Sequence, residues 1–274
     1  MENSLTKKYL LKKKIGAGEF GEIFIGENKV TGREVAIKIG IDKDRVLINN
    51  EAKIYNVLAD EKGYPKMRGY GKEGEYSYIV MDLLGKSLEV KRRENGKYSI
   101  KEVICIGLLL LRKLERLHEL GYIHRDLKPE NIVYDREGKD IYIIDYGLAK
   151  GYMKNGEHIE NRKINSIIGT PRYISLNIHR GNMPSRRDDI EALGYILVYL
   201  LVDKLPWEGI EENDMNKRLK IVEKIKREEN ILDIYPELPM ELLTIIEYSR
   251  KLKYVDCPNY KYLRGILNNL LEIL

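Results

Sequence analysis

The chain has 274 residues, 43% of them hydrophobic and 33% charged, which supplies enough apolar side chain to bury a core and excludes a disordered chain. A chain of this length forms one domain or one domain of two lobes. Its formal net charge of +5 permits an anionic partner but does not require nucleic acid, and we expect none. The two cysteines lie far apart without metal-ligand spacing, which favours a reducing compartment over a disulfide framework or a zinc site.

No segment predicts export or membrane insertion. The first residues are polar and rich in lysine and contain no apolar signal core. The longest apolar runs, Val103–Leu111 and Ala192–Val202, are shorter than the ~20 residues needed to cross a bilayer. We therefore expect buried helices at both runs, no association with a membrane, and a cytoplasmic or nuclear location.

Short strands are predicted over the first part of the chain, at 10–16, 21–27, 34–39 and 76–81. The third alternates apolar and polar residues with the period of two that a half-buried strand shows. Residues 44–60 instead have helical spacing, because Ile48, Ala52 and Tyr55 recur at intervals that place them on one helix face.

Helices dominate the predicted structure after residue 85. Ser99 is a candidate cap for a long helix to about residue 120, where Gly121 is a typical terminator. A hairpin is expected at 132–134 and 141–144, followed by helices at 188–202, 214–228, 240–252 and 259–273. A β-rich first part and a larger α-rich second part would leave a cleft between them, where ligands usually bind.

A glycine-rich segment separates the first two predicted strands. It has the pattern GxGxxGxI over residues 15–23, and its candidate nucleotide-binding residues are Ile15, Gly16, Ala17, Gly18, Gly21 and Ile23. Glycines let a backbone approach phosphates and point N–H groups at them, although a plain hairpin turn fits the segment equally well. A dinucleotide-binding fold fits poorly, because a strand rather than a helix follows.

A lysine near the end of the next strand has a possible partner on the following helix. The strand reads Val-Ala-Ile-Lys and ends at Lys38, and Glu51 lies on the predicted helix. An ion pair between these side chains would hold Lys38 against the phosphates of a nucleotide. Taken alone, Glu51 could equally lie on a solvated helix face.

Two motifs in the second part of the chain are far more specific. The first is His-Arg-Asp-Leu-Lys-Pro-Glu-Asn at 124–131, and the second is Asp-Tyr-Gly at 145–147 after an apolar strand. Phosphoryl transfer needs an aspartate that orients the attacking hydroxyl, here Asp126, and metal ligands, here Asn131 and Asp145. The order and spacing of these motifs after the glycine segment favour this chemistry over a purely structural origin.

Three further residues would complete the catalytic region. Lys128 follows Asp126 by two residues and could lie between the base and the transferred phosphate. The hydroxyl of Thr170 is expected near Asp126. Asp189 would accept hydrogen bonds from the backbone of the catalytic loop, although its place at the start of an apolar helix would also suit an N-cap.

From about Tyr9 onwards the chain resembles the eukaryotic protein kinases, and within them it is most similar to the casein kinase I family. The segments that carry this similarity are 81–89 (Met-Asp-Leu-Leu-Gly-Lys-Ser-Leu-Glu), 169–177 (Gly-Thr-Pro-Arg-Tyr-Ile-Ser-Leu-Asn), 185–189 (Ser-Arg-Arg-Asp-Asp), 205–209 (Leu-Pro-Trp-Glu-Gly) and 258–264 (Pro-Asn-Tyr-Lys-Tyr-Leu-Arg). Tyr146 and residues 153–158 are also similar to the vaccinia-related kinases, a sister group, whereas Arg125 and the Asp188-Asp189 pair fit casein kinase I better.

The resemblance implies an α+β, bilobal protein kinase fold. One domain would span residues 1–274, with a small β-rich N-lobe (about 1–81) containing one main helix, a hinge (about 82–85) and a larger α-helical C-lobe (about 86–274). ATP would bind in the cleft between the lobes together with Mg²⁺. The implied activity is transfer of the γ-phosphate of ATP to serine or threonine of acidic or previously phosphorylated proteins, by a monomer.

The resemblance also implies residue roles. Asp126 would be the catalytic base, with Lys38, Glu51, Lys128 and Thr170 assisting it. Other ATP-binding residues would be Ala36, Met81 as gatekeeper, and Asp82 and Leu84 in the hinge. A basic pocket that reads a substrate phosphate would contain Arg172 and Lys220, and a second anion pocket would contain Arg125 and Lys150. For most of the other lysines in the basic run at 217–227, a solvated helix face is expected.

Two other functions remain open at this point. A pseudokinase, acting as a binding protein or scaffold on the same fold, usually lacks the phosphate-binding lysine or a catalytic or metal aspartate, and Lys38, Asp126 and Asp145 are all present. A small-molecule phosphotransferase of related fold would not need the Gly-Thr motif at 169–170, because that platform serves extended peptides.

Overall fold

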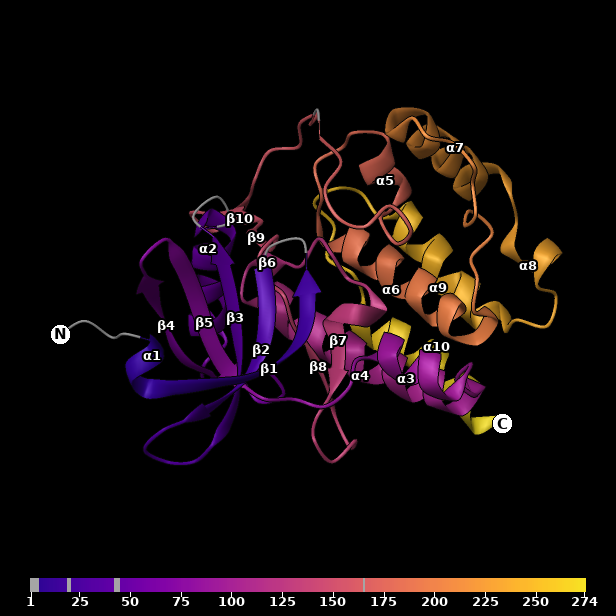
Figure 1. Ribbon diagram of the computed structural model, residues 1–274. Coiled ribbons are helices and arrows are strands. Elements are labelled where there is room, and N and C mark those ends of the chain that lie inside the picture. Colours follow the sequence, from indigo (N-terminus) through magenta and orange to yellow (C-terminus); the bar gives the residue numbers. More distant parts are fainter. Residues whose placement is uncertain (1–4, 19–20, 42–44, 165) are drawn as a thin grey trace. The chain divides into compact units, whose positions relative to one another are not determined.

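The structure is a computed structural model that describes residues 5–18, 21–41, 45–164 and 166–274. These residues form two compact units (Figure 1). The described parts of Met1–Lys86 and Val133–Ala149 make up the first, and Ser87–Ile132 with the described parts of Lys150–Leu274 make up the second.

The first unit is built on a five-stranded antiparallel sheet with the strand order β1-β2-β3-β5-β4 (Figure 1). The bounds of its elements are α1 (Leu5–Lys8), β1 (Tyr9–Gly18), β2 (Gly21–Asn28), β3 (Glu34–Ile41), α2 (Arg45–Val57), β4 (Met67–Glu73), β5 (Tyr76–Asp82), β7 (Ile132–Tyr134) and β8 (Ile141–Ile143), of which β7 and β8 pair with each other. The strands predicted for 10–16, 21–27, 34–39 and 76–81 are confirmed, as are α2 and the β7–β8 hairpin.

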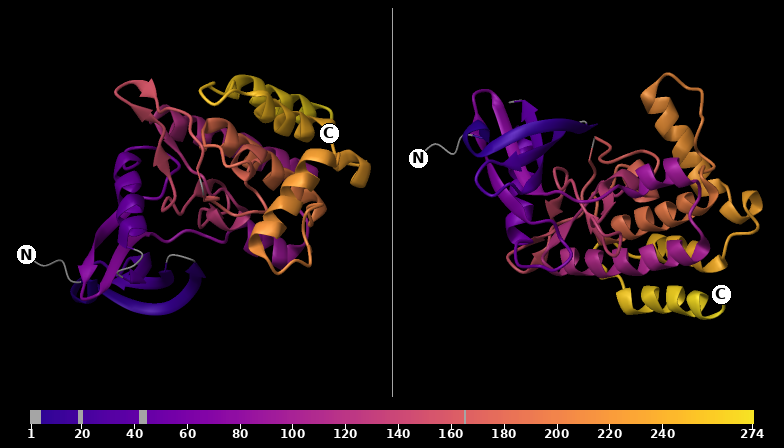
Figure 2. Two further views of the ribbon diagram at one scale, coloured as in Figure 1. Left: turned by 90° about the horizontal axis from the view of Figure 1, so that it is seen from above. Right: turned by 60° about the horizontal axis from the view of Figure 1, so that its bottom comes forward.

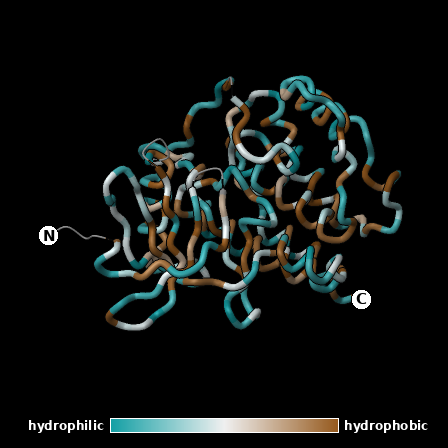
Figure 3. Tube along the Cα trace, in the orientation of Figure 1, coloured by the Kyte–Doolittle hydropathy of each residue, from teal (hydrophilic) through white to brown (hydrophobic). Residues whose placement is uncertain are grey.

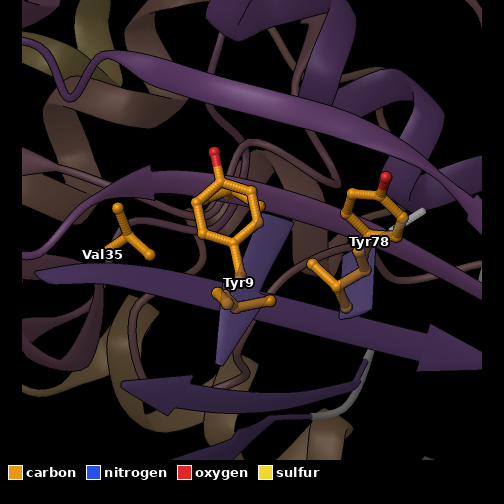
Figure 4. Close-up of a cluster of buried hydrophobic side chains, with 6 residues drawn as sticks. Tyr9, Val35 and Tyr78 are labelled. Carbon is orange, nitrogen blue, oxygen red and sulfur yellow. The ribbon is translucent and has the colours of Figure 1, made fainter. Parts of the chain in front are cut away.

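Alternation along β3 divides its side chains between the two faces of the sheet. Val35 and Ile37 point into a cluster of buried apolar side chains, formed with Leu5, Tyr9, Tyr78 and Val80, part of which Figure 4 shows. Because successive strand residues face opposite sides, Ala36 and Lys38 point to the other face. That face is packed by α2, since Lys38 bonds to a residue of this helix.

The second unit is mostly helical. Its elements are α3 (Leu88–Asn95), α4 (Ile100–Glu119), β6 (Tyr122–Ile123), η2 (Pro129–Asn131), β9 (Lys150–Gly151), β10 (Met153–Lys154), β11 (Glu157–His158), α5 (Leu176–His179), α6 (Arg186–Val202), α7 (Met215–Glu228), α8 (Ile231–Ile234), α9 (Met240–Lys251) and α10 (Tyr260–Glu272). The helices predicted for the 100–120, 188–202, 214–228, 240–252 and 259–273 regions are confirmed. Figure 2 shows α10 alongside α4, and Figure 3 shows α7 as the most hydrophilic of the long helices here.

Helix α6 is the centre of this unit, and nearly all its residues are buried. It packs against α4 and α9. Gly194 leaves no room for a Cβ beside Ile246 of α9, and a Cβ at Gly107 of α4 would lie 2.8 Å from Leu267 of α10 and 3.1 Å from Leu197 of α6. The close approach of these helices therefore depends on two glycines.

Among the described residues, no helix is both long enough and apolar enough to span a bilayer.

Local capping explains where α4 begins. The Ser99 hydroxyl accepts a hydrogen bond from the Glu102 backbone N–H (3.3 Å), and the Glu102 carboxylate accepts one from the Ser99 N–H (2.8 Å). This reciprocal capping box satisfies two donors that the helix itself leaves unpaired. Gly121 follows the helix with a positive φ of 84°, as the sequence predicted. The chain then continues directly towards the motif at 124–131.

Candidate active site

In the first unit, Lys38 connects two acidic side chains from different elements. Its Nζ lies 2.7 Å from Glu51 Oε2 on α2 and 2.7 Å from Asp145 Oδ1, which follows β8. The ion pair predicted between Lys38 and Glu51 is therefore present, and both residues are buried. Asp145 has a left-handed backbone conformation (φ 64°), which is uncommon for a residue with a side chain.

The two carboxylates of this trio stabilise the charge of the lysine between them. Burial alone lowers the pKa of Lys38, but the two carboxylates outweigh it and the pKa lies above its ordinary value. Burial raises the pKa of Glu51, and the nearby ammonium only partly offsets this. A buried lysine that stays charged and is held from two sides is suited to bind an anionic phosphate.

The glycine segment connects β1 to β2. Gly18 and Gly21 are paired across the two strands, and residues 19 and 20 between them lie outside the described residues. Gly21 has a φ of 139°, and a Cβ there would collide with the carbonyl of Ile39 on β3. In contrast, a Cβ at Gly16 would meet only the Ile23 side chain, at an ordinary 3.7 Å. The need for glycine at 21 thus comes from packing within the sheet.

The residues expected to contact adenine come from neighbouring strands. Ala36 of β3 is paired with Met81 of β5, and both side chains are buried. The Asp82 carboxylate is held by Arg68, with bonds of 2.7 and 3.1 Å, and by Arg33 at 3.0 Å. These contacts fix the start of the 82–85 segment. Two other residues expected to contact ATP are more accessible, since Ile15 is exposed and Leu84 is partly buried.

In the second unit, Asp126 is held by three residues of the predicted site. Its Oδ1 accepts hydrogen bonds from the Thr170 backbone N–H (2.9 Å) and hydroxyl (2.7 Å), and its Oδ2 lies 2.7 Å from Lys128 Nζ. Asn131 Nδ2 donates to the Asp126 carbonyl at 3.0 Å. Both oxygens of a buried carboxylate are thereby oriented, as a general base requires.

A second buried carboxylate orders the backbone before Asp126. Asp189 Oδ2 accepts from the His124 N–H (2.8 Å) and lies 2.8 Å from His118 Nε2, and its Oδ1 accepts from the Arg125 N–H (3.0 Å). This contact with the loop backbone was predicted, and the alternative of an N-cap is wrong, because Ser185 caps α6. Burial raises the pKa of Asp189, but His118 and these donors outweigh it and the pKa is lowered.

The two residues assigned to a substrate phosphate pocket have different surroundings. Arg172 forms an ion pair with Glu208 (3.1 Å), and its guanidinium lies over the rings of Tyr173 and Tyr199. Lys220 is exposed on α7. One of these two cations is thus engaged with Glu208, and the other lies at the surface of a helix.

The residues of the second anion pocket do lie close together, and a further cation joins them. Burial lowers the pKa of Lys150, and the positive charges of Arg125 and Arg162 lower it further. Arg125 is largely buried, which also lowers its pKa. Arg162 was not predicted as part of this pocket, and it belongs to no motif that would mark it.

Lys226 is the main residue that the sequence analysis misjudged. It lies in the basic run expected to be solvated, yet it is 1% exposed. Its Nζ donates to the carbonyls of Pro171 (3.0 Å) and Ile174 (2.7 Å), lies 3.3 Å from His179 Nε2, and stacks on the rings of Tyr195 and Trp207. Burial lowers the pKa of Lys226 well below its ordinary value.

The candidate metal ligands are hard oxygen donors. Asn131 turns its amide nitrogen to the Asp126 carbonyl, which leaves its side-chain oxygen as a ligand atom, and Asp145 contributes a partly exposed carboxylate. One or two such protein ligands, completed by phosphate oxygens and water, are typical of Mg²⁺ sites in phosphoryl transfer. Within the described residues, no group of three or more histidine, cysteine, aspartate or glutamate side chains could hold a metal ion.

The sequence was compared with models of known protein families. The model described as the protein kinase domain matches residues 9–255, which is most of the chain. The match includes the glycine segment, the trio around Lys38, the loop around Asp126 and the helices that hold this loop.

Proposed function

The chain belongs to the protein kinase family, and on this premise we propose that it is a serine/threonine kinase of the casein kinase I type, with acidic or previously phosphorylated protein substrates. Membership of the family implies transfer of phosphate from ATP to proteins and dependence on a divalent metal ion. The finer proposal rests chiefly on one contact, the 2.7 Å bond between Lys128 and Asp126. A cation beside the base, where it can also reach the transferred phosphate, resembles the serine/threonine pattern rather than the tyrosine pattern.

Each held side chain has a role in this proposal. Asp126 orients the substrate hydroxyl and accepts its proton at Oδ2 or Oδ1, while Lys128 and Thr170 fix the carboxylate. Lys38 binds phosphate oxygens of ATP, and Glu51 fixes the lysine. Asn131 and Asp145 would hold Mg²⁺, which neutralises charge on the phosphates when bound. Most of the rate enhancement then comes from positioning and from charge stabilisation.

The preference for acidic substrates is supported by excess positive charge around the catalytic loop. Arg125, Lys150 and Arg162 lie near enough to one another to lower the pKa of Lys150. Such a cluster attracts an acidic or phosphorylated segment. Arg172 gives weaker support, because a substrate phosphate would have to compete with Glu208 for its guanidinium.

Three peptides that differ only in the acceptor test the first part of the proposal. Each carries the same acidic flanks and presents serine, threonine or tyrosine, with Mg²⁺ and labelled ATP. We expect label on the serine and threonine peptides. Transfer to tyrosine alone would contradict the assignment, and a lack of transfer to all three that persists with whole acidic proteins would favour a pseudokinase.

A second pair of peptides tests the substrate class. One peptide has phosphoserine three positions before the acceptor, and its twin has unmodified serine there. We expect a higher kcat/KM for the phosphorylated peptide, and we expect Lys150→Ala to reduce that advantage by about tenfold, the loss of one charge-assisted hydrogen bond. Equal kcat/KM for the two peptides would contradict this part of the proposal.

A further inference from the structure

Asn50 connects helix α2 to the chain that follows Asp145. It lies next to Glu51, and its Nδ2 is 2.8 Å from the carbonyl oxygen of Ala149 and 2.9 Å from that of Gly147. A third carbonyl, that of Tyr146, lies at 3.3 Å. An amide nitrogen has two hydrogens to donate, so the two shorter contacts use both and the third is a weaker, shared contact. One side chain thus binds three carbonyls within four residues.

These contacts connect two neighbouring residues of α2 to Asp145 and to the backbone that follows it. Glu51 bonds to Lys38, which bonds to the Asp145 carboxylate, while Asn50 bonds to the backbone just after it. Tyr146 adds an edge-to-face contact with Tyr55 of α2, with ring centroids 5.3 Å apart. All of these residues belong to the first unit.

The backbone at this point needs such support. Asp145 has a positive φ, which costs free energy for a residue with a side chain and persists only where the surroundings hold it. Residues 146–149 form no regular strand, and a backbone hydrogen bond within this stretch runs from the Ala149 N–H to the Tyr146 carbonyl (2.9 Å). The Asn50 amide adds to this turn by donating to the carbonyls of Gly147 and Ala149.

We propose that Asn50 is a positioning residue, which latches residues 146–149 to α2 and so keeps Asp145 where it can hold Mg²⁺ and Lys38. The expected kinetic effects rest on the proposed function, whereas the contact between Asn50 and residues 146–149, called the latch below, does not. An element that carries both Glu51 and Asn50 aligns the lysine and the metal-binding aspartate together. If α2 shifted, both contacts would be lost at once.

Two substitutions at Asn50 and one at its neighbour test the latch. Asn50→Asp replaces the two donors by a carboxylate facing three carbonyl oxygens, and Asn50→Leu removes the donors while keeping similar volume. Asn49→Asp is the matched control, because Asn49 is exposed on the same helix and its side-chain oxygen accepts a hydrogen bond from the Tyr70 hydroxyl (3.4 Å), which a carboxylate can also accept.

The first readout is hydrogen exchange in the protein without nucleotide. We expect backbone amides of residues 146–150 to exchange faster in both Asn50 variants and to be unchanged in Asn49→Asp. This measurement needs no substrate, so it tests the latch even if the proposed acceptor specificity is wrong. Unchanged exchange in both Asn50 variants would overturn the proposal.

The second readout separates positioning from general stability. We expect kcat to fall about tenfold and the Mg²⁺ concentration for half-maximal rate to rise, the scale seen when groups that orient metal ligands are lost. The KM for the peptide should stay within about twofold. Faster exchange without a change in kcat or in Mg²⁺ dependence, or an equal loss in Asn49→Asp, would overturn the positioning role. Asn50→Leu covers the case in which Asn50→Asp does not fold.

Discussion

The two groups of candidate catalytic residues are held in different ways. In the first unit, side chains hold one another, since the buried Lys38 bonds to both the buried Glu51 and the partly exposed Asp145. In the second unit, a buried carboxylate on the central helix α6 holds the backbone that precedes Asp126. The first arrangement depends on one helix, α2, being in place. The second arrangement depends on Asp189 of α6, a helix that is held in place by close packing in the core of its unit.

The largest effect should come from Asp126, the proposed catalytic base. Asp126→Asn keeps an acceptor for Thr170 but removes the group that takes the proton, so we expect kcat to fall about a thousandfold. Because the backbone contacts of Asp189 do not involve this side chain, the thermal midpoint should change little. Steady-state kinetics and a melting curve check both points. A variant with at least a tenth of the wild-type kcat would show that another group is the base.

A smaller loss is expected in the first unit. Glu51→Gln removes the buried carboxylate that holds Lys38, while Asp145 still binds the lysine, so we expect kcat/KM for ATP to fall about a hundredfold. Glu27→Gln is the control, because Glu27 is paired with Lys12 at the surface. Equal effects of the two substitutions, measured by varying ATP at saturating peptide, would contradict the role given to the trio.

A third group of contacts, those of Lys226, holds the segment that includes Arg172. Lys226→Met fills a similar volume but removes the ammonium that donates to the carbonyls of Pro171 and Ile174. We expect the KM for a peptide substrate to rise about tenfold and the KM for ATP to remain unchanged. Lys224→Met is the matched control, since Lys224 is exposed on the same helix. A rise in both KM values would show that the defect is general.

The smallest effect concerns pH. Burial, followed by the charge of Lys226, lowers the pKa of His179 to about 3. The unfolded chain then binds a proton below its ordinary pKa of about 6.5, whereas the folded chain does not. The stability contribution is complete above pH 6.5 and is lost as pH falls towards 3, by up to about 1.4 kcal/mol per pH unit. Melting curves of His179→Gln should show a shallower decline between pH 7 and 5, and parallel curves would contradict the assignment.

Contacts that follow from short motifs and local periodicity could be predicted from the sequence. Helical spacing predicted the helix that carries Glu51, although not the face on which Glu51 lies. The motif at 124–131 brought Asp126, Lys128 and Asn131 together within a few residues. The capping box at Ser99 needed only neighbouring residues. These features arise from interactions over one or two turns, which the sequence pattern records directly.

Contacts made by a side chain with distant backbone could not be predicted. Asn50 and Lys226 bind carbonyl oxygens, which every residue has, so no sequence signal marks their partners. Lys226 was therefore predicted to be solvated, like the other cations of the basic run at 217–227. Strand β4 was missed for a related reason, because its polar and glycine-containing sequence becomes a strand only through pairing with β5.

The central claim is that two separately supported groups of side chains serve one phosphoryl transfer. A double-mutant cycle of Lys38→Met and Asp126→Asn, with kcat measured on one serine peptide, tests it most directly. We predict that each single variant loses at least about a hundredfold and that the double variant is much less impaired than the product of the two losses, as in residues that act as a unit. Wild-type kcat in either single variant, or fully multiplicative losses, would contradict the account.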